Sequence, residues 1–169
     1  MDVSTGDEFA IVGRLLLAGF LGGFIGLERE LRGYPAGIRS LALVTIGSCL
    51  FTDVSRLMGG DDRVAAQIVT GIGFLGAGVI FREGYTVRGI TTAATIWSAA
   101  AIGMSIGIGL YIVAILGSIA LFGALEARPL TRRIVEFVRR VGGELREDQE
   151  NSHPAQDQMD PLDEPGRGD

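Results

Sequence analysis

Long uncharged runs separated by short charged segments dominate this chain. Residues 64–81 carry no charge over 18 positions, and residues 89–125 carry none over 37. A helix needs about 20 apolar residues to cross a bilayer, whereas 37 residues would form a helix of about 55 Å, too long for one crossing of a ~30 Å core. The longer run must therefore contain a turn, and Gly103, Gly107 and Gly109 mark its expected position.

This pattern predicts an all-α fold, a polytopic membrane helical bundle of five transmembrane helices. The expected spans are residues 9–27, 38–58, 64–81, 90–106 and 110–125. A short polar turn at residues 82–89 is expected to join the third and fourth spans into a helical hairpin.

The composition divides the chain into four parts. In order they are a short external N-terminus at residues 1–8, the five-span membrane domain at 9–125, a basic amphipathic helix at 126–141, and an acidic tail at 142–169. We expect the amphipathic helix to lie along the inner leaflet, with an ordinary solvated helix end as the alternative. The tail has too few large apolar side chains to fold and is expected to be disordered.

Charge and composition narrow the functional class. The hydrophobic content is 47%, and the net charge of -5 arises mainly in the acidic tail, so no nucleic-acid surface is indicated. The single Cys49 cannot form an intrachain disulfide. The acidic N-terminus lacks the positive region of a secretory signal peptide, so the first hydrophobic segment is expected to stay in the protein.

The arginines predict an orientation. All 15 basic residues are arginine, and three basic clusters lie at residues 29–39, 82–88 and 128–146. The positive-inside rule places all three in the cytoplasm. This requires five spans, with the N-terminus outside and the C-terminus in the cytoplasm.

Glycines are expected to form packing faces inside the bundle, because helices in lipid approach one another closely where residues are small. They occur in the first span as the GxxxG pairs Gly19–Gly23 and Gly22–Gly26, and in the third span as Gly71, Gly73 and Gly76. We expect leucine at Gly73 or Gly76 to impair folding through overpacking. The alternative, that glycine is simply frequent in this chain, stays open.

Depth along the helices predicts an outer polar cluster of Arg14, Asp53 and Gln67. Arg14 lies about five residues inside the outer end of the first span, and Asp53 lies about five residues before the outer end of the second. At ~1.5 Å per residue both are roughly 8 Å below the surface. Gln67 enters from the same side. The cluster is either a functional site or an ion pair that fixes helix register.

An inner charged cluster is expected at the cytoplasmic side. Its members are Glu28, Arg29, Arg39, Arg82 and Arg88. The excess of positive charge suits anionic lipid headgroups or an acidic partner, and it is poorly suited to holding a bare cation. A plain topology signal is the alternative interpretation.

The sequence offers no set of residues that is typical of an enzyme active site. The only histidine, His153, lies in the tail, and the glycine-rich run at 71–78 has no strand before it, as a nucleotide-binding loop would. Magnesium prefers carboxylates and retained waters, and within or at the edge of the spans only Asp53 and Glu28 offer them. We therefore expect a non-enzymatic protein without a cofactor, and any metal site stays unassigned.

Three segments carry a family resemblance: residues 26–30 (GLERE), 35–40 (PAGIRS) and 67–97 (QIVTGIGFLGAGVIFREGYTVRGITTAATIW). In these segments the sequence resembles the MgtC/SapB family of bacterial inner-membrane proteins. The likeness extends over roughly residues 13–125. The matching positions are Glu28, Arg29, Gly37, Arg39, Gln67, Gly71, Gly73, Gly76, Arg82, Gly89, Thr91, Thr92 and Trp97.

The resemblance implies a multi-pass protein of the bacterial inner membrane that contributes to magnesium homeostasis and to stress adaptation during growth in low magnesium. Members of the family regulate other membrane machinery, including the ATP synthase, and many are labelled magnesium transporters. The first hypothesis is accordingly a regulator that contacts other membrane proteins within the lipid bilayer, as a monomer or homo-oligomer. The second is a small ion or solute transporter, for Mg²⁺ or another species.

The sequence departs from the family after residue 125. Virulence-associated members carry a folded soluble domain at the C-terminus, where this chain has the basic segment and acidic tail. The resemblance therefore does not extend to a role in virulence.

Overall fold

The computed structural model describes residues 4–60 and 62–127. The amphipathic helix expected at residues 126–141 lies outside the described residues except for its first two positions, and the expected tail lies wholly outside them.

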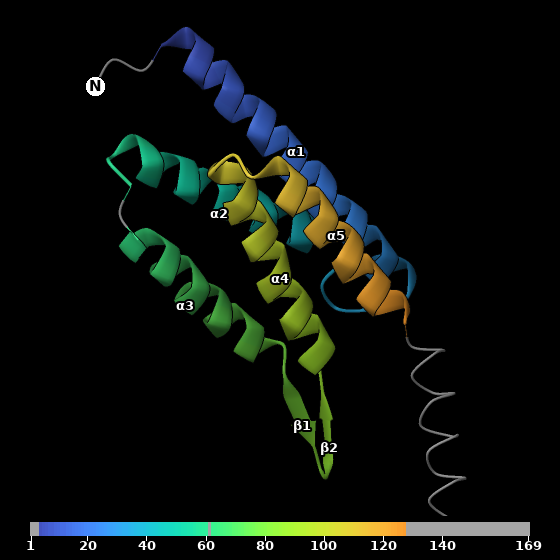
Figure 1. The fold of residues 1–169 in the computed structure, drawn as a ribbon. Coiled ribbons are helices and arrows are strands. Elements are labelled where there is room, and N and C mark those ends of the chain that lie inside the picture. Colours follow the sequence, from blue (N-terminus) through green and yellow to red (C-terminus); the bar gives the residue numbers. More distant parts are fainter. Residues whose placement is uncertain (1–3, 61, 128–169) are drawn as a thin grey trace, which may run out of the picture. The chain divides into compact units, whose positions relative to one another are not determined.

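Five helices and one two-stranded hairpin make up the described fold (Figure 1). The elements are α1 (Thr5–Leu31), α2 (Ile38–Leu57), α3 (Asp62–Gly78), β1 (Phe81–Glu83), β2 (Thr86–Arg88), α4 (Ile90–Gly107) and α5 (Tyr111–Glu126). The five predicted helices are all present. The polar turn expected at residues 82–89 is instead an antiparallel hairpin.

Three of the described helices, α1, α2 and α4, are long and apolar enough to cross a membrane. Helix α5 is apolar but has only 16 residues, and α3 has 17. The third predicted span is shorter than expected because the helix ends at Gly78 and the chain enters the hairpin. Crossing of the bilayer by α3 and α5, and the orientation of the bundle, stay predictions.

Local interactions define where the helices begin. Before α1, the Ser4 hydroxyl accepts from the Asp7 backbone N–H at 3.3 Å, while the Asp7 carboxylate accepts from the Ser4 N–H at 3.2 Å. This reciprocal pair satisfies two backbone donors that the first turn of a helix leaves free. At the start of α2, the Ile38 N–H donates to the Glu30 carboxylate at 2.8 Å, which fastens α2 to the end of α1.

A turn divides the long uncharged run, as predicted. Helix α4 ends at Gly107, and Gly109 has a φ of +87°, a conformation that glycine adopts readily. Gly103 and Gly107, however, lie inside α4 and are buried. They serve helix packing, and only Gly109 serves the turn.

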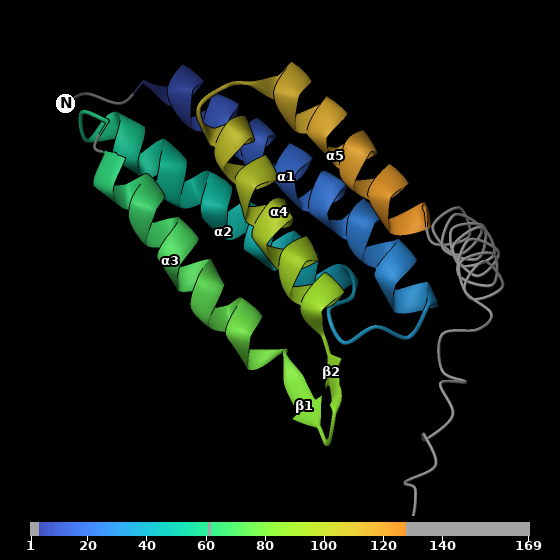
Figure 2. The same ribbon diagram turned by 60° about the horizontal axis from the view of Figure 1, so that its bottom comes forward.

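The core of the bundle lies where α1, α2 and α4 meet, with α3 and α5 at the margins (Figures 1 and 2). Helix α5 packs beside α1 through a stacked aromatic pair, Phe24 and Phe122, with ring centroids 5.3 Å apart. The buried apolar side chains of the core are Ala18, Leu21, Ile25, Ala36, Leu41, Cys49, Ile96, Ala99, Ile102, Ile106, Ala114 and Leu125.

Four glycines let α1 and α4 approach α2 closely. A methyl group at Gly26 would lie 2.6 Å from the Ile38 Cα, and one at Gly107 would lie 2.7 Å from the Thr52 Cβ. A methyl group at Gly22 would overlap the Thr45 hydroxyl, and one at Gly103 would overlap the Thr45 carbonyl oxygen. Gly22 and Gly26 in α1, and Gly103 and Gly107 in α4, each have the GxxxG spacing that brings helix backbones together in membranes.

The glycines predicted to form packing faces divide between packed and open positions. A methyl group at Gly19 would lie 3.0 Å from Ile46, one at Gly23 would lie 3.7 Å from Ile38, and one at Gly76 would lie 3.5 Å from Ala93. At Gly71 and Gly73 it would meet nothing within 4 Å. The prediction that Gly71 and Gly73 pack against another helix of the bundle is therefore wrong. The inward stripe of α3 runs through Ile68, Ile72 and Gly76, with Val79 following just after the helix, and Gly71 and Gly73 lie off it.

Candidate functional site

A buried ion pair joins α1 to α2. Arg14 Nη1 lies 2.9 Å from Asp53 Oδ1, with the Asp53 side chain 0% exposed and Arg14 7% exposed. A charge buried in an apolar interior is costly unless it is paired and hydrogen-bonded, so each residue requires the other. The two residues predicted from depth alone thus meet in the structure.

Further groups complete the surroundings of Asp53. Arg56 Nη2 lies 3.3 Å from the same carboxylate oxygen, and the Cys49 thiol donates to the other at 3.8 Å. Arg14 also donates to the Gly107 carbonyl at 3.4 Å, at the C-terminal end of α4, where a helix dipole favours positive charge. This outer ion-pair site, Arg14, Cys49, Asp53 and Arg56, therefore connects α1, α2 and α4.

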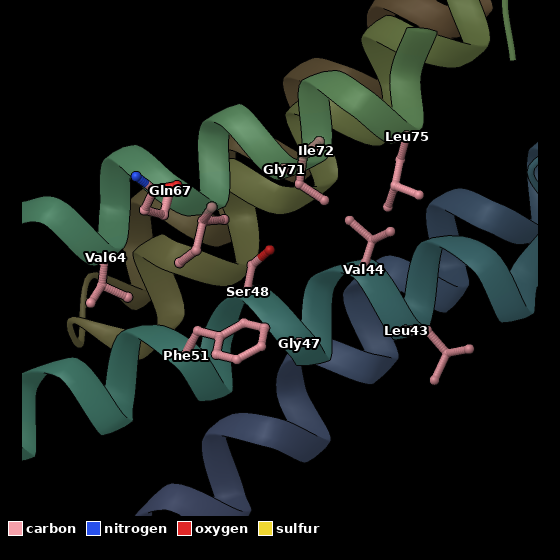
Figure 3. Close-up of a pocket in the computed structure, with 11 residues that line it drawn as sticks. Leu43, Val44, Gly47, Ser48, Phe51, Val64, Gln67, Gly71, Ile72 and Leu75 are labelled. Carbon is pink, nitrogen blue, oxygen red and sulfur yellow. The ribbon is translucent and has the colours of Figure 1, made fainter. Parts of the chain in front are cut away.

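Gln67 does not belong to the outer ion-pair site. It lies on an exposed face of α3 and lines a groove between α2 and α3 (Figure 3). Conversely, Arg56 and Cys49 belong to the site although they were not predicted. Their positions three residues after and four residues before Asp53 place them on the same helical face, and that spacing was the available signal.

Arg29 is the central residue at the opposite end of the bundle. It is 1% exposed, its Nη2 donates to the Thr92 hydroxyl at 3.1 Å, and its guanidinium carbon lies 3.5 Å from the centroid of the Tyr34 ring. The stacked guanidinium and the hydrogen bond use the planar geometry of arginine. Arg29 thereby fastens the end of α1 to the start of α4 and to the loop before α2.

The other predicted inner residues are dispersed. Glu28 is buried and pairs with Arg32 at 2.7 Å, Arg39 is exposed at the start of α2, and Arg82 and Arg88 lie on the hairpin. The five residues therefore do not form one cluster, because only Glu28 and Arg29 are buried and the three other arginines are exposed. The end of α1, the start of α2 and the hairpin do share one end of the bundle (Figure 2).

We predict that Arg29→Lys lowers the stability of the bundle by about 1 to 2 kcal/mol, because lysine keeps the charge but loses the planar stack on Tyr34. Thermal unfolding of the purified protein in detergent measures this loss. The matched control is Arg39→Lys, on the exposed face of α2, which should leave the melting temperature unchanged. Equal melting temperatures for the two variants would contradict a structural role for the Arg29 stack.

A groove of about 560 Å³ runs between α2 and α3 (Figure 3). It is mostly apolar, with Ser48 pointing from α2 toward α3 and Gln67 above it on α3. The lining residues are Leu43, Val44, Gly47, Ser48, Phe51, Val64, Gln67, Ile68, Gly71, Ile72 and Leu75. A methyl group at Gly47 or Gly71 would meet nothing within 4 Å, so small residues on both helices keep the groove open.

The interior between the outer ion-pair site and Arg29 is closely packed. Three buried hydroxyls there, those of Thr45, Thr52 and Thr95, each donate to a carbonyl of their own helix at 2.7 Å. Their donors are therefore satisfied locally and do not link into a chain. In the part of the chain that the structure describes, no group of three or more His, Cys, Asp or Glu residues could hold a metal ion.

Comparison with known protein families identifies the family to which the chain belongs. The family model described as "MgtC family" matches residues 15–134. The chain belongs to the MgtC family. The match includes Asp53, Arg29 and every residue of the α2–α3 groove, and it begins one residue after Arg14.

Three relatives illustrate the likeness. "Protein MgtC" of Brucella abortus is 57% identical over 83 residues, 47% of this chain and 35% of the relative. "Protein MgtC" of Salmonella typhimurium is 52% identical over 94 residues, 54% of this chain and 41% of the relative. "Uncharacterized protein slr0014" of Synechocystis is 48% identical over 122 residues, 70% of this chain and 52% of the relative.

This MgtC-family chain spans about a third to a half of the length of these curated relatives. No solved structure matches it. Family membership and the three apolar helices together make it a membrane protein of MgtC type.

Proposed function

We propose that this protein is a non-enzymatic, multi-pass protein of the bacterial inner membrane that regulates other membrane machinery through helix contacts. The setting is magnesium or ion homeostasis and adaptation to low magnesium, and the ATP synthase and transporters are partners that the family resemblance suggests. The observation that carries the proposal is the open, mostly apolar groove of about 560 Å³ between α2 and α3, which is larger than the groove of about 340 Å³ between α4 and α5.

Glycines in the same chain support helix docking in this groove. Where α1 and α4 meet α2, glycines admit the neighbouring backbone, and a methyl group at Gly26 would lie 2.6 Å from α2. Gly47 and Gly71 face the groove with nothing within 4 Å of the corresponding methyl position. Since glycine costs a helix interior up to about 1 kcal/mol relative to alanine, open glycines of this kind suit a surface that receives another helix.

Gln67 supports the same proposal from its polarity. No hydrogen bond of its amide to another described residue is present, and it lines a groove whose other side chains are mostly apolar. An amide left unsatisfied in an apolar medium costs roughly 1 to 3 kcal/mol. A docked helix that carries a polar side chain at this depth would relieve that cost through an interhelical hydrogen bond.

Transport of an ion or solute is the competing hypothesis. It requires a polar route from the outer ion-pair site to the opposite end of the bundle. Between them, most of the described interior consists of apolar side chains, and the buried hydroxyls of Thr45, Thr52 and Thr95 are bonded within their own helices. This packing supports regulation by contact over conduction through a single copy of the chain.

Site-specific photocrosslinking tests the proposal. A photoreactive residue at Leu75, which lines the groove, should yield a discrete adduct with another membrane protein in native membranes, and the yield should differ between low and ample magnesium. The matched control is the same residue at Leu116, exposed on α5, which should give no such adduct.

We predict that Gly71→Leu, which places a side chain in the groove, reduces the Leu75 adduct at least about fivefold, the effect of ~1 kcal/mol of overpacking. The level of the protein in the membrane should stay unchanged, since Gly71 contacts no other helix. Identical adducts from Leu75 and Leu116 would remove the groove from the proposal. Magnesium flux into proteoliposomes that contain only this protein would favour the transport hypothesis instead.

A further inference from the structure

The hairpin β1–β2 extends from one end of the bundle (Figure 1). Its register pairs Phe81 with Arg88, Arg82 with Val87, and Glu83 with Thr86. Paired residues of an antiparallel ladder point to the same face, and successive pairs alternate. Each face of the hairpin therefore combines one large apolar side chain with one arginine.

Two glycines hold the hairpin in a defined direction. Gly84, the first residue of the two-residue loop, has a φ of +60°, as such turns require. Gly89 has a φ of +92°, and a methyl group there would overlap the Val79 carbonyl oxygen. The strand that leaves the hairpin is thus fitted against the end of α3, and the hairpin is a fixed extension of the helices.

The hairpin has no core of its own. All six strand residues are exposed, as is the whole of Tyr85 at the tip. A two-stranded hairpin alone is marginally stable in water, and it gains stability when its apolar side chains pack against another surface. Phe81, Tyr85 and Val87 therefore indicate that this element rests against something outside the described bundle.

We propose that the hairpin lies in the headgroup layer and binds anionic phospholipid headgroups through Arg82 and Arg88. Charge complementarity identifies the occupant, because guanidinium groups bind phosphate oxygens in paired hydrogen bonds and attract an anionic leaflet. Aromatic side chains such as Tyr85 and Phe81 favour the same boundary between lipid and water. The assignment of the hairpin to the cytoplasmic leaflet rests on the orientation that the arginine clusters predict.

The geometry of the charged groups fits this role. Arg82 Nε donates to the Gly84 carbonyl at 3.1 Å, which holds its guanidinium near the tip of the hairpin. Arg88 Nε lies 3.8 Å from the Glu83 carboxylate, and both side chains are largely exposed, so this loose pair leaves Arg88 able to meet a phosphate. Strands of three residues extend about 10 Å, comparable with the ~5 to 7 Å of headgroup layer on each side of the hydrocarbon core.

The test uses the full chain in lipid nanodiscs, with Thr86→Cys carrying an environment-sensitive fluorophore next to an intact Tyr85. Cys49 is fully buried, so it should not react with the fluorophore. The protein that keeps Thr86, treated with the same fluorophore, reports any background labelling of Cys49. The discs contain phosphatidylcholine alone or an equimolar mixture with phosphatidylglycerol, each with a headgroup-attached nitroxide as quencher. Quenching should be stronger in the anionic discs, and each of Arg82→Gln and Arg88→Gln should weaken the preference roughly fivefold.

Glu83→Gln is the matched control on the same hairpin and should strengthen the preference for anionic discs, because it removes the one opposing charge. Equal quenching in both lipids, or no effect of the arginine variants, would overturn the proposal. Weak quenching in both kinds of disc, combined with crosslinking of Thr86→Cys to an intracellular protein, would also overturn it. Both faces of a nanodisc carry the same lipids, so this result does not depend on orientation. Labelling of Thr86→Cys from outside intact cells would instead overturn the orientation alone.

Discussion

Gly103→Ala is expected to lower the free energy of unfolding by about 1 to 3 kcal/mol, although it adds only one methyl group. That methyl group would overlap the Thr45 carbonyl oxygen and would lie 3.0 Å from the Ser48 Cβ. A backbone carbonyl within a packed helix cannot rotate away as a flexible side chain can, so α4 would have to move off α2. Thermal unfolding in detergent and the steady-state level in membranes measure the effect.

Gly13→Ala is the matched control for this variant. A methyl group at Gly13 meets nothing within 4 Å, and alanine is the better helix former by up to about 1 kcal/mol, so the stability should stay the same or rise. Equal melting temperatures for the two alanine variants would contradict the close approach of α4 to α2.

The helices were predictable because the bilayer imposes strong limits on a sequence. The spans expected at 64–81, 90–106 and 110–125 correspond to α3, α4 and α5 within a few residues. Apolar length and charged separators determine such boundaries. The hairpin was missed because Ile80 and Phe81 continue the apolar run of α3 and conceal the end of the helix.

For the candidate site, the sequence predicted the depth of each residue in the membrane but not its position around the bundle. Counting residues from the ends of the spans gives depth, and depth correctly brought Arg14 to Asp53. It says nothing about the position of a helix around the bundle, and Gln67, although near the same end, lies on α3, which packs beside α2 and α4. The prediction of glycine packing faces was wrong at Gly71 and Gly73 for the same reason, because the direction of a helix face depends on where the neighbouring helices lie.

The second large effect is expected at Asp53, where the structure predicts an asymmetry between the two partners of the buried pair. Asp53 receives both Arg14 and Arg56, so Asp53→Asn leaves two guanidinium groups without a carboxylate and should cost about 3 to 5 kcal/mol. Arg14→Gln leaves Asp53 still paired with Arg56 and should cost less, about 1 to 3 kcal/mol. Arg56→Gln should change stability by less than about 1 kcal/mol, because that side chain is nearly half exposed.

Combining Arg14→Gln with Asp53→Asn should restore part of the stability that Asp53→Asn loses, because two neutral amides can hydrogen-bond and Arg56 can turn toward water. Unfolding measurements on the four proteins of this cycle give the coupling between the residues, expected at about 0.5 to 3 kcal/mol. Additive losses would contradict a direct interaction. Growth in low magnesium separates two roles for the pair. If the pair only fixes helix register, the double variant recovers both its level in the membrane and its function. If the pair is a functional site, the double variant recovers its level in the membrane but not its function.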